Sequence, residues 1–202
     1  MQIIPDRIKY TLMHHLISRQ FRDVRYLCMF VGYPRSGHSL VGSLLDAHRR
    51  MVISHELDIL GKLESGLSFH QVTAMVVANA RRFARRGRTW TGYDYTVPGQ
   101  YQGKLEMPLV IGDKQGGRTV KRLYENPELL DLLLEKSPWP VKMIHVTRNP
   151  FDNIVTRARG GNEKRKEIKT ERIWKRARLH FQQAEIIMQL KEDPRIDVYE
   201  FK

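Results

Sequence analysis

The chain has 202 residues, with 35 Lys and Arg against 22 Asp and Glu and a single cysteine. This length is typical of one domain, here residues 1–202, and suffices to bury about 70% of the surface exposed on unfolding. Cys28 alone excludes an internal disulfide and a thiolate zinc site. No apolar stretch approaches the ~20 residues of a membrane span, and charges interrupt the N-terminal residues where a signal peptide would be apolar. We therefore expect a cytoplasmic globular protein.

The net charge of +13 points to anionic partners. Ten Lys and Arg stand against three Glu in residues 157–178, and five arginines lie in residues 81–88. Three interpretations stay open: a nucleic acid or other polyanion, a small molecule that carries phosphate or sulfate, and a solvated helix face. The scarcity of aromatic residues between the basic ones disfavours a single-stranded nucleic acid.

The elements are predicted from apolar patterns bounded by turn residues. The apolar run 26–31, which ends at Gly32, is typical of a strand buried on both faces, and Leu40, Leu44 and Leu45 have helical spacing within 39–48. Strands alternating with helices predict an α/β fold of three layers, with a mostly parallel sheet flanked by helices. The further predicted elements are strands near 52–54, 109–111, 141–146 and 196–201, and helices over 69–86, 127–134 and 168–191.

Residues 32–39, Gly-Tyr-Pro-Arg-Ser-Gly-His-Ser, lie between a predicted strand and a predicted helix. Glycines let a backbone wrap an oxyanion, and the free amides at a helix start donate to it. The spacing Gly-x4-Gly-x-Ser is close to a Walker A loop, but His38 replaces its lysine, which weighs against an NTPase. The predicted donors are the Ser36 and Ser39 hydroxyls and the amides of Ser36, Gly37, His38 and Ser39.

Residues 33–39 resemble the first signature of the sulfotransferases, which binds the 5′-phosphosulfate of 3′-phosphoadenosine-5′-phosphosulfate. The run Arg148-Asn-Pro, which follows a predicted strand, resembles the second signature, and Thr156 stands eight residues later where the family has a serine. The family's Arg and Ser hold the 3′-phosphate, a role that suits the planar fork of Arg148. The resemblance covers residues 26–201.

This resemblance implies a P-loop-like nucleotide-binding fold and a sulfuryl transfer to a hydroxyl or amine acceptor. The product would be adenosine-3′,5′-bisphosphate, and no metal would be needed. The implied acceptor is a small molecule or glycan, and an anionic one suits the basic charge, although an apolar alcohol also fits. The implied donor-binding residues are Pro34, Arg35, Ser36, Gly37, His38, Ser39, Arg148 and Thr156.

Sulfuryl transfer needs cations near the leaving phosphate and a base near the acceptor. The resemblance gives Arg35 the loop's cation, and Lys114, just past the predicted strand 109–111, is the second candidate. Cytosolic family members have a Lys-Thr-His triplet there, but Lys114 is followed by Gln and Gly, so that base is missing. Candidate replacements are Glu56, which we favour, then His55, with His38 a third option and a helix-capping role for Glu56 the alternative. Asp113 is expected to orient Lys114 by an ion pair.

Two other functions stay open beside this one. A P-loop nucleotide kinase could use Asp113 as a weak Walker B acid, but it lacks the loop lysine. A non-catalytic polyanion- or nucleic-acid-binding domain would use the basic stretch 157–178. The eight histidines show no metal-binding spacing, and the family's basic Gly-rich segment near the C-terminus has no counterpart, so a shortened form is also an expectation.

Overall fold

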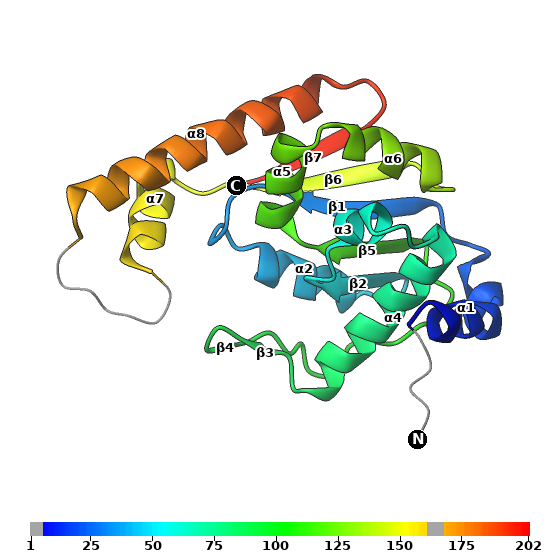
Figure 1. Ribbon diagram of the computed structural model, residues 1–202. Helices are drawn as coiled ribbons and strands as arrows, with labels where there is room; N and C mark the ends of the chain where they lie inside the picture. The colour runs from blue at the N-terminus through cyan, green and yellow to red at the C-terminus, as the bar shows by residue number, and fades with distance from the viewer. Residues whose placement is uncertain (1–5, 161–167) are drawn as a thin grey trace.

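The computed structural model describes residues 6–160 and 168–202. Its centre is a five-stranded sheet in the order β2-β5-β1-β6-β7 (Figure 1), and every neighbouring pair of strands is parallel. The predicted α/β fold with a parallel sheet is therefore confirmed. The strands are β1 (Tyr26–Val31), β2 (Met51–His55), β5 (Val110–Lys114), β6 (Val141–Val146) and β7 (Asp197–Phe201).

Helices flank the sheet, and a two-stranded hairpin follows one of them. The hairpin consists of β3 (Thr89–Trp90) and β4 (Tyr93–Asp94). The helices are α1 (Asp6–Ile17), the 3₁₀ turn η1 (Ser18–Phe21), α2 (His38–Asp46), α3 (Ile59–Glu64), α4 (Phe69–Arg85), α5 (Gly116–Glu125), α6 (Glu128–Lys136), α7 (Pro150–Arg159) and α8 (Thr170–Glu192).

The central strand β1 is apolar throughout because both of its faces are covered. Leu27, Met29 and Val31 belong to the larger core cluster, together with residues of α1, α4 and α5. The alternate residues Cys28 and Phe30 belong to a smaller cluster that α2 covers with partly buried side chains. Successive side chains of a strand point to opposite faces, so an unbroken apolar run is what a doubly covered strand requires.

The strand predicted at 109–111 is longer than expected, because β5 continues through Gly112 to Lys114. Gly112 does not mark a turn; a Cβ at this position would overlap the carbonyl group of Cys28 on the neighbouring strand. The glycine therefore permits close approach of β1 and β5. As a result Lys114 is the last residue of the strand and not a residue beyond it.

The helices α1, α3 and α5 were not among the predicted elements. Helix α5 begins with two glycines, which lower its helix propensity. Packing supplies what propensity lacks, since Val120 and Leu123 of α5 are buried in the core. The predicted helix 168–191 corresponds to α8, but the basic stretch 157–178 includes residues 161–167, which lie outside the described part of the chain. No helix in the described ranges is long and apolar enough to cross a membrane.

Candidate functional site

A cavity of about 560 Å³ lies at the carboxyl edge of the sheet. The segments that follow β1, β2, β5 and β6 meet at this edge because all four strands are parallel. Every predicted donor-binding residue except Ser36 lines the cavity. Among the predicted catalytic residues, Arg35, Lys114 and Glu56 also line it, whereas His55 does not.

The loop after β1 has the backbone of an anion-binding turn. Gly37 precedes the first residue of α2 and has a φ of 101°, a left-handed conformation that glycine adopts at little cost. Arg35 also has a positive φ, of 71°, which is uncommon for a residue with a side chain. The first amides of a helix have no intrahelical acceptors, so those of His38 and Ser39 are available to an anion in the cavity.

Local capping explains why Arg148 stands where it does. Asn149 caps α7, with its Oδ1 accepting from the amides of Phe151 at 2.9 Å and Asp152 at 3.4 Å. Pro150 occupies the first helical turn, where its missing N–H costs nothing. Arg148 is therefore the last residue before the cap, and Thr156, two turns into α7, lines the same cavity.

The two signature segments are joined by hydrogen bonds. Arg148 Nη1 donates to the Arg35 carbonyl oxygen at 3.1 Å, and Asn153 Nδ2 donates to the Pro34 carbonyl oxygen at 2.9 Å. Asn153 is fully buried and also lies 3.3 Å from the Ser36 hydroxyl. The Ser36 hydroxyl thus contacts α7, and Ser36 does not line the cavity as its predicted donor role would require. No sequence signal singled out Asn153.

Lys114 Nζ lies between two oxygen atoms at the base of the cavity. It donates to Ser39 Oγ at 3.0 Å and to Glu56 Oε1 at 2.9 Å. The Lys114 side chain is only 4% exposed, whereas that of Glu56 is 33% exposed. Burial lowers the pKa of Lys114 from its usual value, and the Glu56 carboxylate and then Asp113 oppose that shift. Lys114 therefore connects the start of α2 to Glu56, the candidate base.

Asp113 does not form the expected ion pair with Lys114. Its buried carboxylate accepts from Ser54 Oγ at 2.7 Å and from the amides of Leu57 at 2.9 Å and Asp58 at 2.8 Å. The residues that donate these bonds lie on both sides of Glu56 along the chain, and the backbone of Glu56 has a φ of 55°. Asp113 therefore orients the turn that carries Glu56, not the lysine beside it. The expectation failed because strand neighbours point to opposite faces.

Of the two histidine candidates for the base, His38 is buried and His55 is half-buried. His55 stacks on Phe83 with ring centroids 4.0 Å apart and meets Trp90 edge-on at 5.1 Å. Burial, with Lys114 and Arg88 nearby, lowers the pKa of His55 to about 3. Burial and the charge of Lys114 lower the pKa of His38 to about 4. Both rings are therefore neutral and weakly basic near pH 7, which leaves Glu56 as the better candidate.

The hairpin β3–β4 forms an aromatic wall of the cavity through Trp90, Tyr93 and Tyr95. Beneath it, Asp46 is fully buried and pairs with Arg88 Nη1 at 2.8 Å, and it also accepts from the Ile53 amide at 2.8 Å. Burial raises the pKa of Asp46, and the Arg88 charge opposes that shift.

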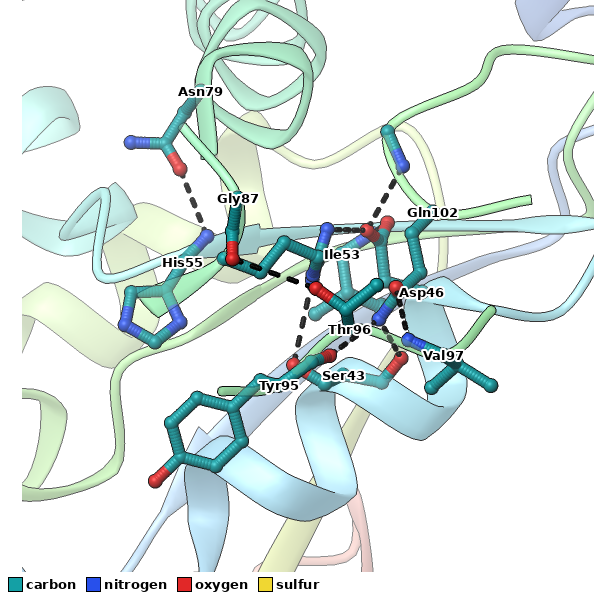
Figure 2. Close-up of polar contacts among 12 residues, drawn as sticks. Ser43, Asp46, Ile53, His55, Asn79, Gly87, Tyr95, Thr96, Val97 and Gln102 are labelled. Atoms are coloured by element: carbon teal, nitrogen blue, oxygen red, sulfur yellow. Dashed lines mark hydrogen bonds and ion pairs between the residues drawn. The ribbon is translucent and has the colours of Figure 1, made fainter. Parts of the chain in front are cut away.

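Figure 2 shows the network around this pair. Gln102 accepts from the Val97 amide at 2.8 Å and donates to the carbonyls of Ser43 and Tyr95, each at 3.0 Å. These bonds tie the irregular segment before β5 to α2, which follows the loop after β1. The irregular segment therefore has a defined structure beside the cavity.

Comparison of the chain with models of protein families finds no matching family, and comparison with curated proteins finds no matching protein. Within residues 6–160 and 168–202, no cluster of His, Cys, Asp and Glu has the arrangement of a metal site.

Proposed function

We propose that this protein is a sulfotransferase that moves the sulfuryl group from 3′-phosphoadenosine-5′-phosphosulfate to a hydroxyl or amine acceptor. One observation carries the proposal. The segments that resemble the two sulfotransferase signatures are far apart in sequence, yet they line one cavity and are joined by the bond from Arg148 to the Arg35 carbonyl. Either segment alone would equally suit a purely structural role, such as a surface ion pair for Arg148.

The cavity suits this donor in charge and size. Four cationic side chains, Arg35, Lys114, Arg118 and Arg148, line it, against one carboxylate, Glu56. A donor with a phosphosulfate and a separate phosphate requires such an excess of positive charge. The volume of about 560 Å³ falls within the usual range for small-molecule sites. In the proposal, the amides at the start of α2 and Arg35 hold the phosphosulfate, and Arg148 and Thr156 hold the 3′-phosphate.

The chemistry is an in-line displacement at sulfur. The acceptor oxygen or nitrogen forms a bond to sulfur while the bond from sulfur to the 5′-phosphate oxygen breaks, and the acceptor's proton moves to Glu56. Arg35 and Lys114 stabilise the charge that grows on the leaving phosphate. Arg35 cannot donate a proton because guanidinium stays charged, whereas the lowered pKa of Lys114 makes it the better proton donor.

The kinase alternative receives less support. A Walker A loop places a lysine ammonium against the outer phosphates, and His38 stands at that position here. His38 is buried and its pKa is lowered to about 4, so it carries no charge near pH 7. The polyanion-binding alternative depends on the basic stretch 157–178, and residues 161–167 of that stretch lie outside the described part of the chain.

The proposal is tested by the release of adenosine-3′,5′-bisphosphate from the sulfated donor in the presence of a panel of phenols, sugars and amines. With any acceptor that supports turnover, Glu56→Gln should reduce the rate by about 10²- to 10⁴-fold, because it removes the base. Lys114→Met should cause a similar loss by removing a cation at the leaving group. Glu106→Gln, at an exposed surface pair, is the control and should keep the wild-type rate.

The proposal is contradicted if the donor is not consumed with any acceptor, or if Glu56→Gln and Lys114→Met turn over like the wild type.

A further inference from the structure

A second cavity, of about 350 Å³, adjoins the first. The two cavities share four lining residues, Glu56, Trp90, Gln115 and Arg118. The second is otherwise lined by His55 and by the C-terminal half of α4, through Asn79, Arg82, Phe83 and Arg86. Glu56 is thus accessible from both cavities, and the proposed donor site accounts for only one of them.

The second cavity is positively charged. Arg82, Arg86 and Arg118 line it, and the one carboxylate, Glu56, is already paired with Lys114 at 2.9 Å. The His55 ring on its wall adds no charge near pH 7, because burial lowers the pKa of His55. An anion that entered this cavity would meet two or three guanidinium groups.

Arg82 and Arg86 are one helical turn apart and therefore lie on the same face of α4. Like charges at this spacing repel each other and destabilise a helix. Within the described ranges, neither arginine forms an ion pair with a carboxylate, whereas arginines 22, 49, 50, 88, 118, 122 and 195 do. Arg118 has only a long contact, 3.7 Å, to Asp58, which Arg122 engages at 2.7 Å.

The helix dipole explains in part why cations stand in the last turn of α4. It does not explain which of them face the cavity. Arg85 is in the same turn and is exposed, yet it does not line the cavity, whereas Arg82 and Arg86 do. This difference provides a matched control.

We propose that the second cavity binds the acceptor, and that the acceptor carries a carboxylate or sulfate group that Arg82 and Arg86 recognise. This inference rests on the proposed function. The indole of Trp90 would contact the body of the acceptor, and the acceptor's hydroxyl would point to Glu56, where the two cavities meet. A bidentate guanidinium contact suits both carboxylate and sulfate.

The test uses two pairs of probes in which one partner carries a carboxylate and the other a neutral group in its place: methyl glucuronide against methyl glucoside, and 4-hydroxyphenylacetate against its amide. Binding is measured by calorimetry, with the protein free and saturated with adenosine-3′,5′-bisphosphate. An acidic probe should bind the saturated wild type about tenfold more tightly than its neutral partner. Arg82→Gln and Arg86→Gln should each remove most of that preference, whereas Arg85→Gln should retain it. Comparison of the sugar pair with the phenol pair shows whether the cavity prefers a sugar or a phenol as the acceptor.

The inference is overturned if neither acidic probe binds, if charged and neutral partners bind equally, or if Arg85→Gln weakens binding as much as Arg82→Gln does. Bisphosphate binding is measured in the same samples, so the two proposals fail separately. A protein that binds the bisphosphate but shows no preference for acidic probes retains the proposed function and loses this inference. A protein that binds acidic probes but not the bisphosphate contradicts the proposed function and, with it, the acceptor role.

Discussion

At the residue scale, His38 shows that burial changes the chemical role of a residue at a motif position. Its imidazole is 7% exposed, packs edge-on against Phe30, and approaches Gly116 so closely that a Cβ there would overlap the ring. A charged lysine at the same place in a Walker A loop would extend to phosphate. His38 instead contributes a neutral wall, and Arg35 and Lys114 provide the positive charge from either side.

This burial predicts a pH dependence of stability. The pKa of His38 is lowered to about 4 in the folded protein, while the unfolded chain keeps the usual value near 6.5. The unfolded state therefore binds the proton first, so the free energy of unfolding should fall as the pH drops from about 6.5 towards 4. The loss from His38 is on the order of 3 kcal/mol. Urea titrations across this range measure it, and His38→Gln should flatten the curve.

An unchanged pH profile in a folded His38→Gln protein would contradict this role of His38. His55 contributes a dependence of the same sign, because its pKa is lowered to about 3. The variant should therefore reduce the slope without abolishing it.

At the element scale, a buried ion pair helps to hold the hairpin β3–β4 to α2. Arg88 is 3% exposed and has a φ of 50°, and its partner Asp46 is fully buried. Asp46 also accepts from the Gly103 amide at 3.0 Å. The pair therefore joins α2 to both ends of the segment that bears the aromatic wall.

Removing the arginine leaves an uncompensated charge in the interior. Arg88→Met should lower the free energy of unfolding by about 3–5 kcal/mol, because a buried carboxylate without its partner is strongly unfavourable. Arg49→Met is the matched control, since Arg49 pairs with Glu106 at 3.1 Å on the exposed surface. Its loss should cost less than about 1 kcal/mol. Denaturant titrations of both variants check this, and equal effects would show that burial does not set the strength of the pair.

Local sequence was a good guide to the elements of the site. The apolar run of β1 and the glycines after it are short-range signals, and each was found where it was predicted. What local sequence could not indicate were partners far along the chain. Asp113 contacts residues more than fifty positions away, and Asn153 reaches the loop after β1 across more than a hundred. Their roles follow from the strand order, which no local pattern specifies.

Tertiary contacts also account for the predictions that were wrong. Ser36 was expected to donate into the cavity, but it does not line the cavity, and its Oγ accepts a hydrogen bond from the fully buried Asn153. In the sequence, Gly112 resembles the end of a strand. In the structure it lies within β5, where a glycine is needed because β1 approaches closely, and no local sequence pattern indicates that contact. Helix α5 was not predicted because its stability comes from packing and not from propensity.

At the scale of the whole molecule, the parallel sheet brings four segments to one edge. Those segments carry both resemblances to the sulfotransferase signatures, the Lys114–Glu56 pair and a concentration of positive charge. The net charge of +13 would draw anionic molecules towards such a cavity, and added salt should weaken that attraction. The proposed function therefore depends on whether the cavity distinguishes a 3′-phosphate.

The most direct measurement is a calorimetric titration of adenosine-3′,5′-bisphosphate and adenosine-5′-monophosphate into the wild type, Arg148→Ala and the control Arg49→Ala. We predict that the wild type and the control bind the bisphosphate at least about tenfold more tightly than the monophosphate, and that Arg148→Ala loses this preference. Equal affinity of the wild type for the two nucleotides would contradict the proposed function.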